Sequence, residues 1–191
     1  HQTSHPEHSD DLVLTGAMHA FWTQGFSATS MQDIIDLTGA NRATLYSTYG
    51  DKRAVFMAAL RHYEGLMRAA LYEAPLETLG PIEVLRDFLM TFVEAEGARG
   101  CFVTNTALEV APHDEEVRKY IASVQTGVER RIVELIDLSK ADGTTPAEID
   151  SSEEAKAILA IAIGLSVLAR TRPNRKFLKS IVDNAMGRLE R

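Results

Sequence analysis

The chain has 191 residues, of which 45% are hydrophobic and 25% charged, and its formal net charge is −7 at pH 7. This composition is that of a globular protein with an ordinary core, and it excludes a fibrous or disordered chain. The single cysteine excludes an internal disulfide, and the uncharged apolar run of residues 157–169 is too short to cross a bilayer. Strand-like alternation is scarce, so we expect an all-α fold of about nine helices.

Residues 1–9 are expected to form a flexible tail rather than the metal site that their three histidines could suggest. A first helix should then run from about Asp10 to Gln24, because Leu14, Ala17 and Phe21 recur at helical spacing. Gly25 should end it.

Residues 29–53 carry the capping signals of two short helices and the start of a third. Ser30 and Asp33 have the spacing of a capping box, and Gly39 is placed to stop the helix that they begin. Asn41 can cap the second helix, and Gly50 with Asp51 can end that helix and cap the next. Two helices joined by a glycine-containing turn predict a helix-turn-helix.

The string TGANRATLYSTYGDK, residues 38–52, resembles the recognition helix of the N-terminal DNA-binding domain of the TetR family of bacterial transcriptional regulators. The resemblance extends from about Leu12 to Tyr63. It implies that Leu45 and Tyr49 point inward, that bases are met by Arg42, Ala43 and Thr44, and that phosphates are met by Thr29, Tyr46, Ser47, Thr48 and Lys52.

The net charge of the N-terminal segment argues against DNA binding. Residues 1–53 contain three basic and six acidic residues, a net charge of −3, so the basic footprint usual in nucleic-acid binding is absent. Arg53 also stands where the family frequently has an acidic residue. The competing interpretation is therefore a helical ligand-binding or interaction protein of the same fold with weak or lost DNA binding.

Beyond residue 53 the pattern predicts a larger helical domain, residues 54–191, behind a DNA-binding domain of residues 1–53. Apolar periodicity and glycine or proline breaks place helices over residues 52–72 and 81–96, on a segment from Cys101 to Pro112, from 114 to about 142, over 153–170, and after Pro173.

By resemblance, these helices enclose an effector pocket, although side chains at helical spacing are more often plain core. The expected lining is Phe88, Phe92, Phe102, Tyr120 and Leu165, with Cys101 nearby and with Asn105, Thr106 or Glu109 as polar anchors. Cys101 is open to two interpretations, a buried structural cysteine or a sensor of oxidants or electrophiles.

The run AILAIAIGLSVLA, residues 157–169, is apolar on every side, so it should be covered on two faces. By resemblance, one face and the last helix form a homodimer interface, for which we expect Ala157, Ala160, Gly164, Phe177 and Ile181.

The sequence thus predicts a regulator, a repressor released from a palindromic operator by a small-molecule effector. Its partners would be double-stranded DNA, the effector and a second copy of the chain, with no membrane. No constellation of catalytic, cofactor-binding or metal-binding residues emerges, so we expect a cytoplasmic protein that is not an enzyme and has no cofactor.

Overall fold

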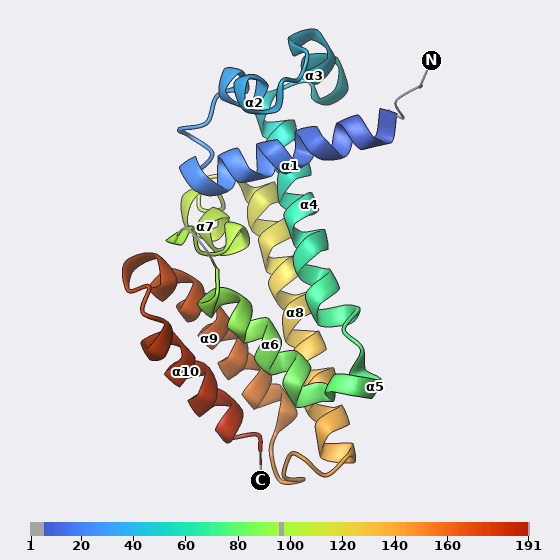
Figure 1. Cartoon of the computed structure of the whole chain (residues 1–191), viewed down its shortest axis with the longest axis vertical. Helices are drawn as coiled ribbons and strands as arrows, with labels where there is room; N and C mark the ends of the chain where they lie inside the picture. The colour runs from blue at the N-terminus through green and yellow to red at the C-terminus, as the bar shows by residue number, and fades with distance from the viewer. Residues whose placement is uncertain (1–5, 96–97, 191) are drawn as a thin grey trace.

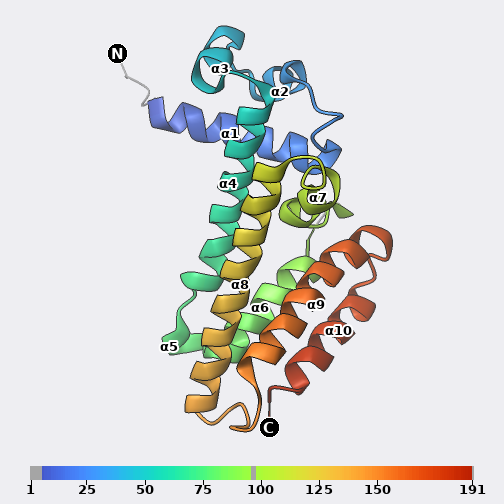
Figure 2. The same ribbon diagram turned by 180° about the vertical axis from the view of Figure 1, so that it is seen from behind.

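The computed structural model describes residues 6–95 and 98–190. Within those ranges the protein is all helical (Figures 1 and 2), which confirms the predicted fold class. Its helices are α1 (Pro6–Gln24), α2 (Met31–Thr38), α3 (Arg42–Tyr49), α4 (Lys52–Tyr72), α5 (Leu76–Leu79), α6 (Pro81–Val93), α7 (Phe102–Glu109), α8 (Glu115–Ala141), α9 (Ser151–Thr171) and α10 (Arg175–Gly187).

The helices α1, α2 and α3 gather at one end of the molecule, and we call them the head. The long helix α4 starts in the head and runs down beside α8 into the remaining helices, which we call the body (Figures 1 and 2). At the other side of the body, α9 and α10 form its outer edge, while α7 lies directly below the head.

The structure changes three of the expected bounds. Helix α1 begins at Pro6 rather than Asp10, because the fixed φ of proline suits a first helical position, while residues 1–5 lie outside the described residues. The segment between α4 and α6 contains the short helix α5, which the sequence pattern did not reveal. Helix α6 ends at Val93, and Glu96, the last residue of the expected helix, lies outside the described residues.

A column of aromatic rings joins head and body. Phe21 of α1 meets Phe56 of α4 edge-on with centroids 5.2 Å apart, and Phe56 stacks on Phe102 of α7 at 5.7 Å. All three side chains are buried within one continuous core. The head is therefore packed on the body and does not hang from a linker.

None of the described helices is long and apolar enough to cross a membrane.

Candidate nucleic-acid interface and pocket

Local capping determines the two helices of the head that follow α1. The side chain of Ser30 accepts a hydrogen bond from the Asp33 amide at 3.0 Å, and the Ser30 amide donates to the Asp33 carboxylate at 2.8 Å. The bond that the carboxylate accepts from the Ser30 amide, and then its interaction with the Ser30 hydroxyl, lower the pKa of Asp33. Gly39 ends α2 at φ 67°, and Asn41 caps α3 by accepting from the Thr44 amide at 3.1 Å. The predicted capping box and caps are confirmed.

Helix α3 presents one face to solvent at the end of the molecule (Figure 1). Leu45 is 2% exposed and faces the core, and Tyr49 packs half-buried against it, as predicted. The exposed side chains are those of Arg42, Ala43, Thr44, Tyr46, Ser47 and Thr48. The small side chains of Ala43, Thr44 and Ser47 leave the helix surface open to close approach by a ligand.

Arg42 stands at the start of this face. Its guanidinium donates to the side-chain oxygen of Gln32 on α2 and lies 5.8 Å from the ring centroid of Tyr46. Gln32 in turn donates to Asp36 at 2.7 Å. Gln32 was missed by sequence reasoning, although its spacing of four from Asp36 places both on one exposed side of α2.

Thr29 does not belong to the exposed face. It is 1% exposed, and its hydroxyl donates to the carbonyl of Gly25 at 2.7 Å, so the expectation of a phosphate contact from its hydroxyl is corrected. The reason is that the chain turns inward between α1 and α2 and uses this hydroxyl to satisfy the end of α1.

Lys52 has a structural partner that the sequence did not reveal. Its ammonium donates to the carbonyl of Phe26 at 2.9 Å and lies 4.2 Å from the centroid of the Phe26 ring. The side chain is half-buried. Lys52 therefore ties the start of α4 to the turn that follows α1.

Arg53, for which the sequence indicated no role, connects the head end of α4 to the body. Its guanidinium donates to both carboxylate oxygens of Asp114, at 2.8 and 3.0 Å, and to Glu116 at 2.9 Å. Asp114 also caps α8 by accepting from the Val117 amide at 3.0 Å. These bonds, led by that from Arg53, lower the pKa of Asp114 to about 2.

Glu109, at the end of α7, holds the turn after α1. Its two carboxylate oxygens accept from the backbone amides of Phe26 at 3.1 Å and Ser27 at 3.0 Å. Gly25, at φ 85°, makes this approach possible, because a β-carbon there would lie 2.7 Å from the Glu109 oxygen. The expectation that Glu109 anchors an effector is thus corrected, since its carboxylate faces the head.

Trp22 makes a third link across the same boundary. Its indole N–H donates to the carbonyl of Gly100 at 3.1 Å, and the Arg99 guanidinium lies 3.9 Å from its ring centroid. Arg99 and Gly100 precede Cys101, the residue that caps α7. Both ends of α7 are therefore in contact with the head.

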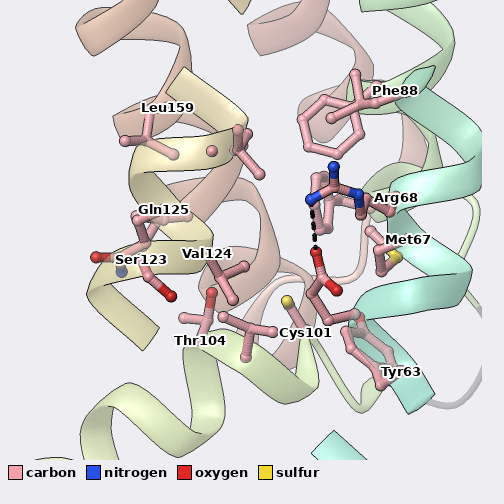
Figure 3. A pocket seen from close by; sticks show the side chains of 18 of the residues that line it. Tyr63, Met67, Arg68, Phe88, Cys101, Thr104, Ser123, Val124, Gln125 and Leu159 are labelled. Atoms are coloured by element: carbon pink, nitrogen blue, oxygen red, sulfur yellow. Dashed lines mark ion pairs between the residues drawn. The ribbon is translucent and has the colours of Figure 1, made fainter. Parts of the chain in front are cut away.

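A cavity of about 260 Å³ lies in the body between α4, α6, α7, α8 and α9 (Figure 3). Of the expected lining residues, Phe88, Phe92, Cys101 and Tyr120 do line it. Cys101 is 8% exposed and neighbours Tyr63, whose pKa is raised by burial and further by this thiol. Seven lining residues that carry polar side chains or aromatic rings were not predicted: Tyr63, Glu64, Arg68, Tyr72, Thr104, Ser123 and Gln125.

The other expected lining residues lie elsewhere, which corrects those assignments. Phe102 is 2% exposed within the aromatic column, and Leu165 is 1% exposed in the core. Asn105 donates to the Arg99 carbonyl at 2.8 Å and accepts from Arg170 at 3.1 Å. The packing of Phe102 in the aromatic column orients α7 so that Phe102 and Asn105 face away from the cavity, whereas Leu165 of α9 is part of the core.

The residues expected at a dimer interface lie on the outer edge of the body. Ala160 is exposed, Ala157 and Gly164 are half-exposed on the same side of α9, and Phe177 and Ile181 of α10 are half-buried. Val167, also on α9, is 40% exposed. This side of α9 is thus apolar but not fully covered within one chain.

Among the described residues, no cluster of three or more histidine, cysteine or acidic side chains is arranged to hold a metal ion. The ordered arrangement is instead an exposed, capped recognition helix joined by polar contacts to a body with an internal cavity. Together these features define a helix-turn-helix DNA-binding regulator.

Comparisons with known proteins give the family. Residues 13–59 match the model described as bacterial regulatory proteins, tetR family, and residues 82–184 match that of the tetracyclin repressor-like C-terminal domain. The chain belongs to the TetR family of bacterial transcriptional regulators.

Relatives support this along nearly the whole length. The HTH-type transcriptional regulator YezE of Bacillus subtilis is 31% identical, with 94% of this chain and 95% of that protein covered. The repressor ComR of Escherichia coli is 28% identical, with 92% and 86% covered. A cysteine mutant of the TetR family regulator CifR, solved with 26-bp double-strand operator DNA, has 29% identity and a TM-score of 0.77, with 94% and 95% covered.

Proposed function

We propose that this regulator is a homodimeric repressor that binds a palindromic operator through α3 and leaves it when a small molecule fills the cavity in the body. The exposed face of α3, capped at both ends and led by Arg42, is the observation that carries the proposal. The operator complex of CifR and the repressor ComR support it by similarity.

The residue roles follow from exposure. Arg42, Ala43 and Thr44 would face the bases, because the N-terminal residues of a recognition helix enter the major groove. Tyr46, Ser47 and Thr48 would donate to phosphates. Lys52 would add a phosphate contact with the donors that its bond to the Phe26 carbonyl leaves available.

In this proposal, residues 1–53 form the DNA-binding domain, and residues 54–191 form the domain that binds the effector and dimerises. A palindrome requires two recognition helices about one DNA turn apart, so a dimer follows from the proposed function. As a regulator acting on a bacterial chromosome it would work in the cytoplasm, and by a binding equilibrium rather than by catalysis.

Replacing Arg42 with alanine should weaken operator binding by about 5- to 150-fold, the worth of one bidentate base contact. The measurement is fluorescence anisotropy with a duplex from the promoter of the protein's own gene. Arg118→Ala is the matched control, because it removes the same charge from an exposed site on α8, 61% exposed. Equal losses in both variants would contradict a specific contact and leave only a charge effect.

Replacing Ala160 with glutamate should convert dimers to monomers, because it places a charge on the uncovered apolar side of α9. Sedimentation analysis measures the change. Ser152→Glu, an exposed position in the first turn of the same helix, should leave the dimer intact. A dimeric Ala160 variant would rule out this side of α9 as the interface.

The acidic head favours a second candidate function, a ligand-binding protein of the same fold with little DNA affinity. The two differ in the anisotropy measurement itself. A repressor binds its own promoter duplex more tightly than a scrambled duplex of equal length, whereas the second candidate binds neither.

A further inference from the structure

The cavity contains one carboxylate and one guanidinium, and both are incompletely paired. Glu64 and Arg68 lie one turn apart on α4, with 3.7 Å between the nearest nitrogen and oxygen, which is too long for a hydrogen bond (Figure 3). Among the described residues, neither group makes a side-chain hydrogen bond to the protein; the Arg68 guanidinium lies 4.6 Å from the ring centroid of Tyr72, a contact that uses the face of the guanidinium and not its N–H donors. The carboxylate can accept about four bonds and the guanidinium can donate five. The pair thus has spare capacity for a ligand.

The carboxylate of the pair is partly shielded from water, whereas the guanidinium is exposed. The Glu64 side chain is 23% exposed and that of Arg68 is 56% exposed, so the carboxylate is the more enclosed of the two. Its field extends to a neighbouring ring, because burial and then Glu64 raise the pKa of Tyr120. Electrostatic contacts in such a site are stronger than on an open surface.

Two further guanidinium groups stand nearby, and both are already engaged. Arg131 donates to the Leu71 carbonyl at 3.2 Å and to Glu134 at 3.1 Å, and Arg61 lies 5.6 Å from the ring centroid of Tyr120. Neither lines the cavity. Among the described residues that line the cavity, the charged ones are Glu64 and Arg68, and their charges cancel.

A ligand with a single charge fits this pair poorly. An anion bound to Arg68 would separate Arg68 from Glu64 and place a second negative charge beside the Glu64 carboxylate. A cation bound to Glu64 would likewise place a second positive charge beside Arg68. A ligand that places a donor next to an acceptor can satisfy both groups at once, and it brings no net charge into the cavity.

The walls and the volume limit the remainder of the ligand. Met67 and Phe88 lie beside Arg68 (Figure 3), and Phe92 and Leu159 also give the cavity apolar lining. An apolar cavity of about 150 Å³ holds benzene. A volume of about 260 Å³ suits one ring with a short polar substituent.

We propose that the ligand of this cavity is a net-neutral molecule of one ring that carries an amide-like group, whose N–H donates to Glu64 and whose oxygen accepts from Arg68. This inference rests on the proposed function for the identity of the effector site, and adds the chemical class of the effector.

The test uses four probes of one size: benzamide, benzoate, benzamidine and ethylbenzene, titrated into the full-length protein by calorimetry. Benzamide should bind about tenfold or more tightly than each of the other three, because each of those leaves at least one charged group without a partner. Benzoate or benzamidine binding as tightly as benzamide would overturn the proposal, and so would the absence of binding by benzamide.

Replacing either Glu64 or Arg68 should change the ligand preference from a neutral to a charged ligand. Glu64→Gln leaves Arg68 as the one charge in the cavity, so benzoate should gain at least about tenfold in affinity; Arg68→Gln should produce the same gain for benzamidine. Glu115→Gln and Arg118→Gln, exposed on α8 outside the cavity, are the matched controls and should change nothing. Unchanged preferences in the folded Glu64 and Arg68 variants, verified by circular dichroism, would also overturn the proposal.

Operator release is measured separately, by anisotropy with benzamide present. Binding of benzamide without release of DNA would support the ligand class and refute the proposed effector mechanism. Release by any probe with no discrimination between charged and neutral forms would support the mechanism and refute the ligand class.

Discussion

Gly25 offers a direct test of the contact between α7 and the head. We predict that Gly25→Ala destabilises the protein through two separable effects. Gly25 has φ 85°, where an alanine is strained, and its new β-carbon would lie 2.7 Å from a carboxylate oxygen of Glu109. The carboxylate would have to retreat from the Phe26 and Ser27 amides, which it meets at 3.1 and 3.0 Å.

The magnitude follows from the two effects. The left-handed backbone costs an alanine about 1–2 kcal/mol. Each of the two hydrogen bonds from the Phe26 and Ser27 amides to Glu109 is exposed to solvent. Each therefore contributes about 0.5–1 kcal/mol, which is less than a buried hydrogen bond to a charged group contributes. Gly25→Ala should therefore lower the free energy of unfolding by about 2–4 kcal/mol.

Gly143→Ala separates the two effects. Gly143 has the same φ of 85°, but a β-carbon there meets no atom within 4 Å, so this variant shows the backbone strain alone. Equilibrium unfolding in urea measures both variants. Their difference, about 1–2 kcal/mol, is the contribution of the Glu109 contact.

A double-mutant cycle supplies the refuting result. In a Glu109→Ala background, Gly25→Ala should cost no more than Gly143→Ala does, because no carboxylate remains to be displaced. If Gly25→Ala costs as much with Glu109 as without it, the carboxylate does not hold the turn and the reasoning is wrong.

Two other contacts give predictions of the same kind. Asp114→Asn keeps an N-cap for α8 but loses the charge that pairs with Arg53. Because the pKa of Asp114 is lowered to about 2, the wild type should be the more stable protein above about pH 4. It should lose that advantage as the pH falls through 2. Urea unfolding of both proteins from pH 7 to pH 2 measures this, and a difference as large at pH 2 as at pH 7 would contradict it. Lys52→Met removes the bond to the Phe26 carbonyl but keeps the length of the side chain, so the melting temperature should fall even without DNA. An unchanged melting temperature combined with weaker operator binding would mean that Lys52 serves DNA alone.

The sequence was sufficient where the cause of a structure is local. Helices α2 and α3 begin and end at Ser30, Gly39, Asn41 and Gly50, and α4 begins at Asp51, because each cap bonds to backbone within four residues along the chain. The inward direction of Leu45 was implied by the resemblance to the family, and the structure has it buried. The family could be inferred from the same stretch, and the family models confirm it.

Tertiary packing decided what each side chain of the body faces. Glu109 was expected in the pocket, yet its carboxylate caps the turn after α1, because the packing of Phe102 on Phe56 fixes the rotation of α7. Glu64 lines the cavity although no sequence signal distinguished it from an ordinary exposed charge on a helix.

The recognition helix shows both contributions in one short segment. Its caps follow from the order of residues 41–50 alone. The connection of the head to the body depends on contacts between residues that are distant in the sequence. Arg53 and Asp114 are separated by 61 positions, and Phe26 and Glu109 by 83. A linear pattern does not specify such contacts, because they exist only once separate helices have packed into one core.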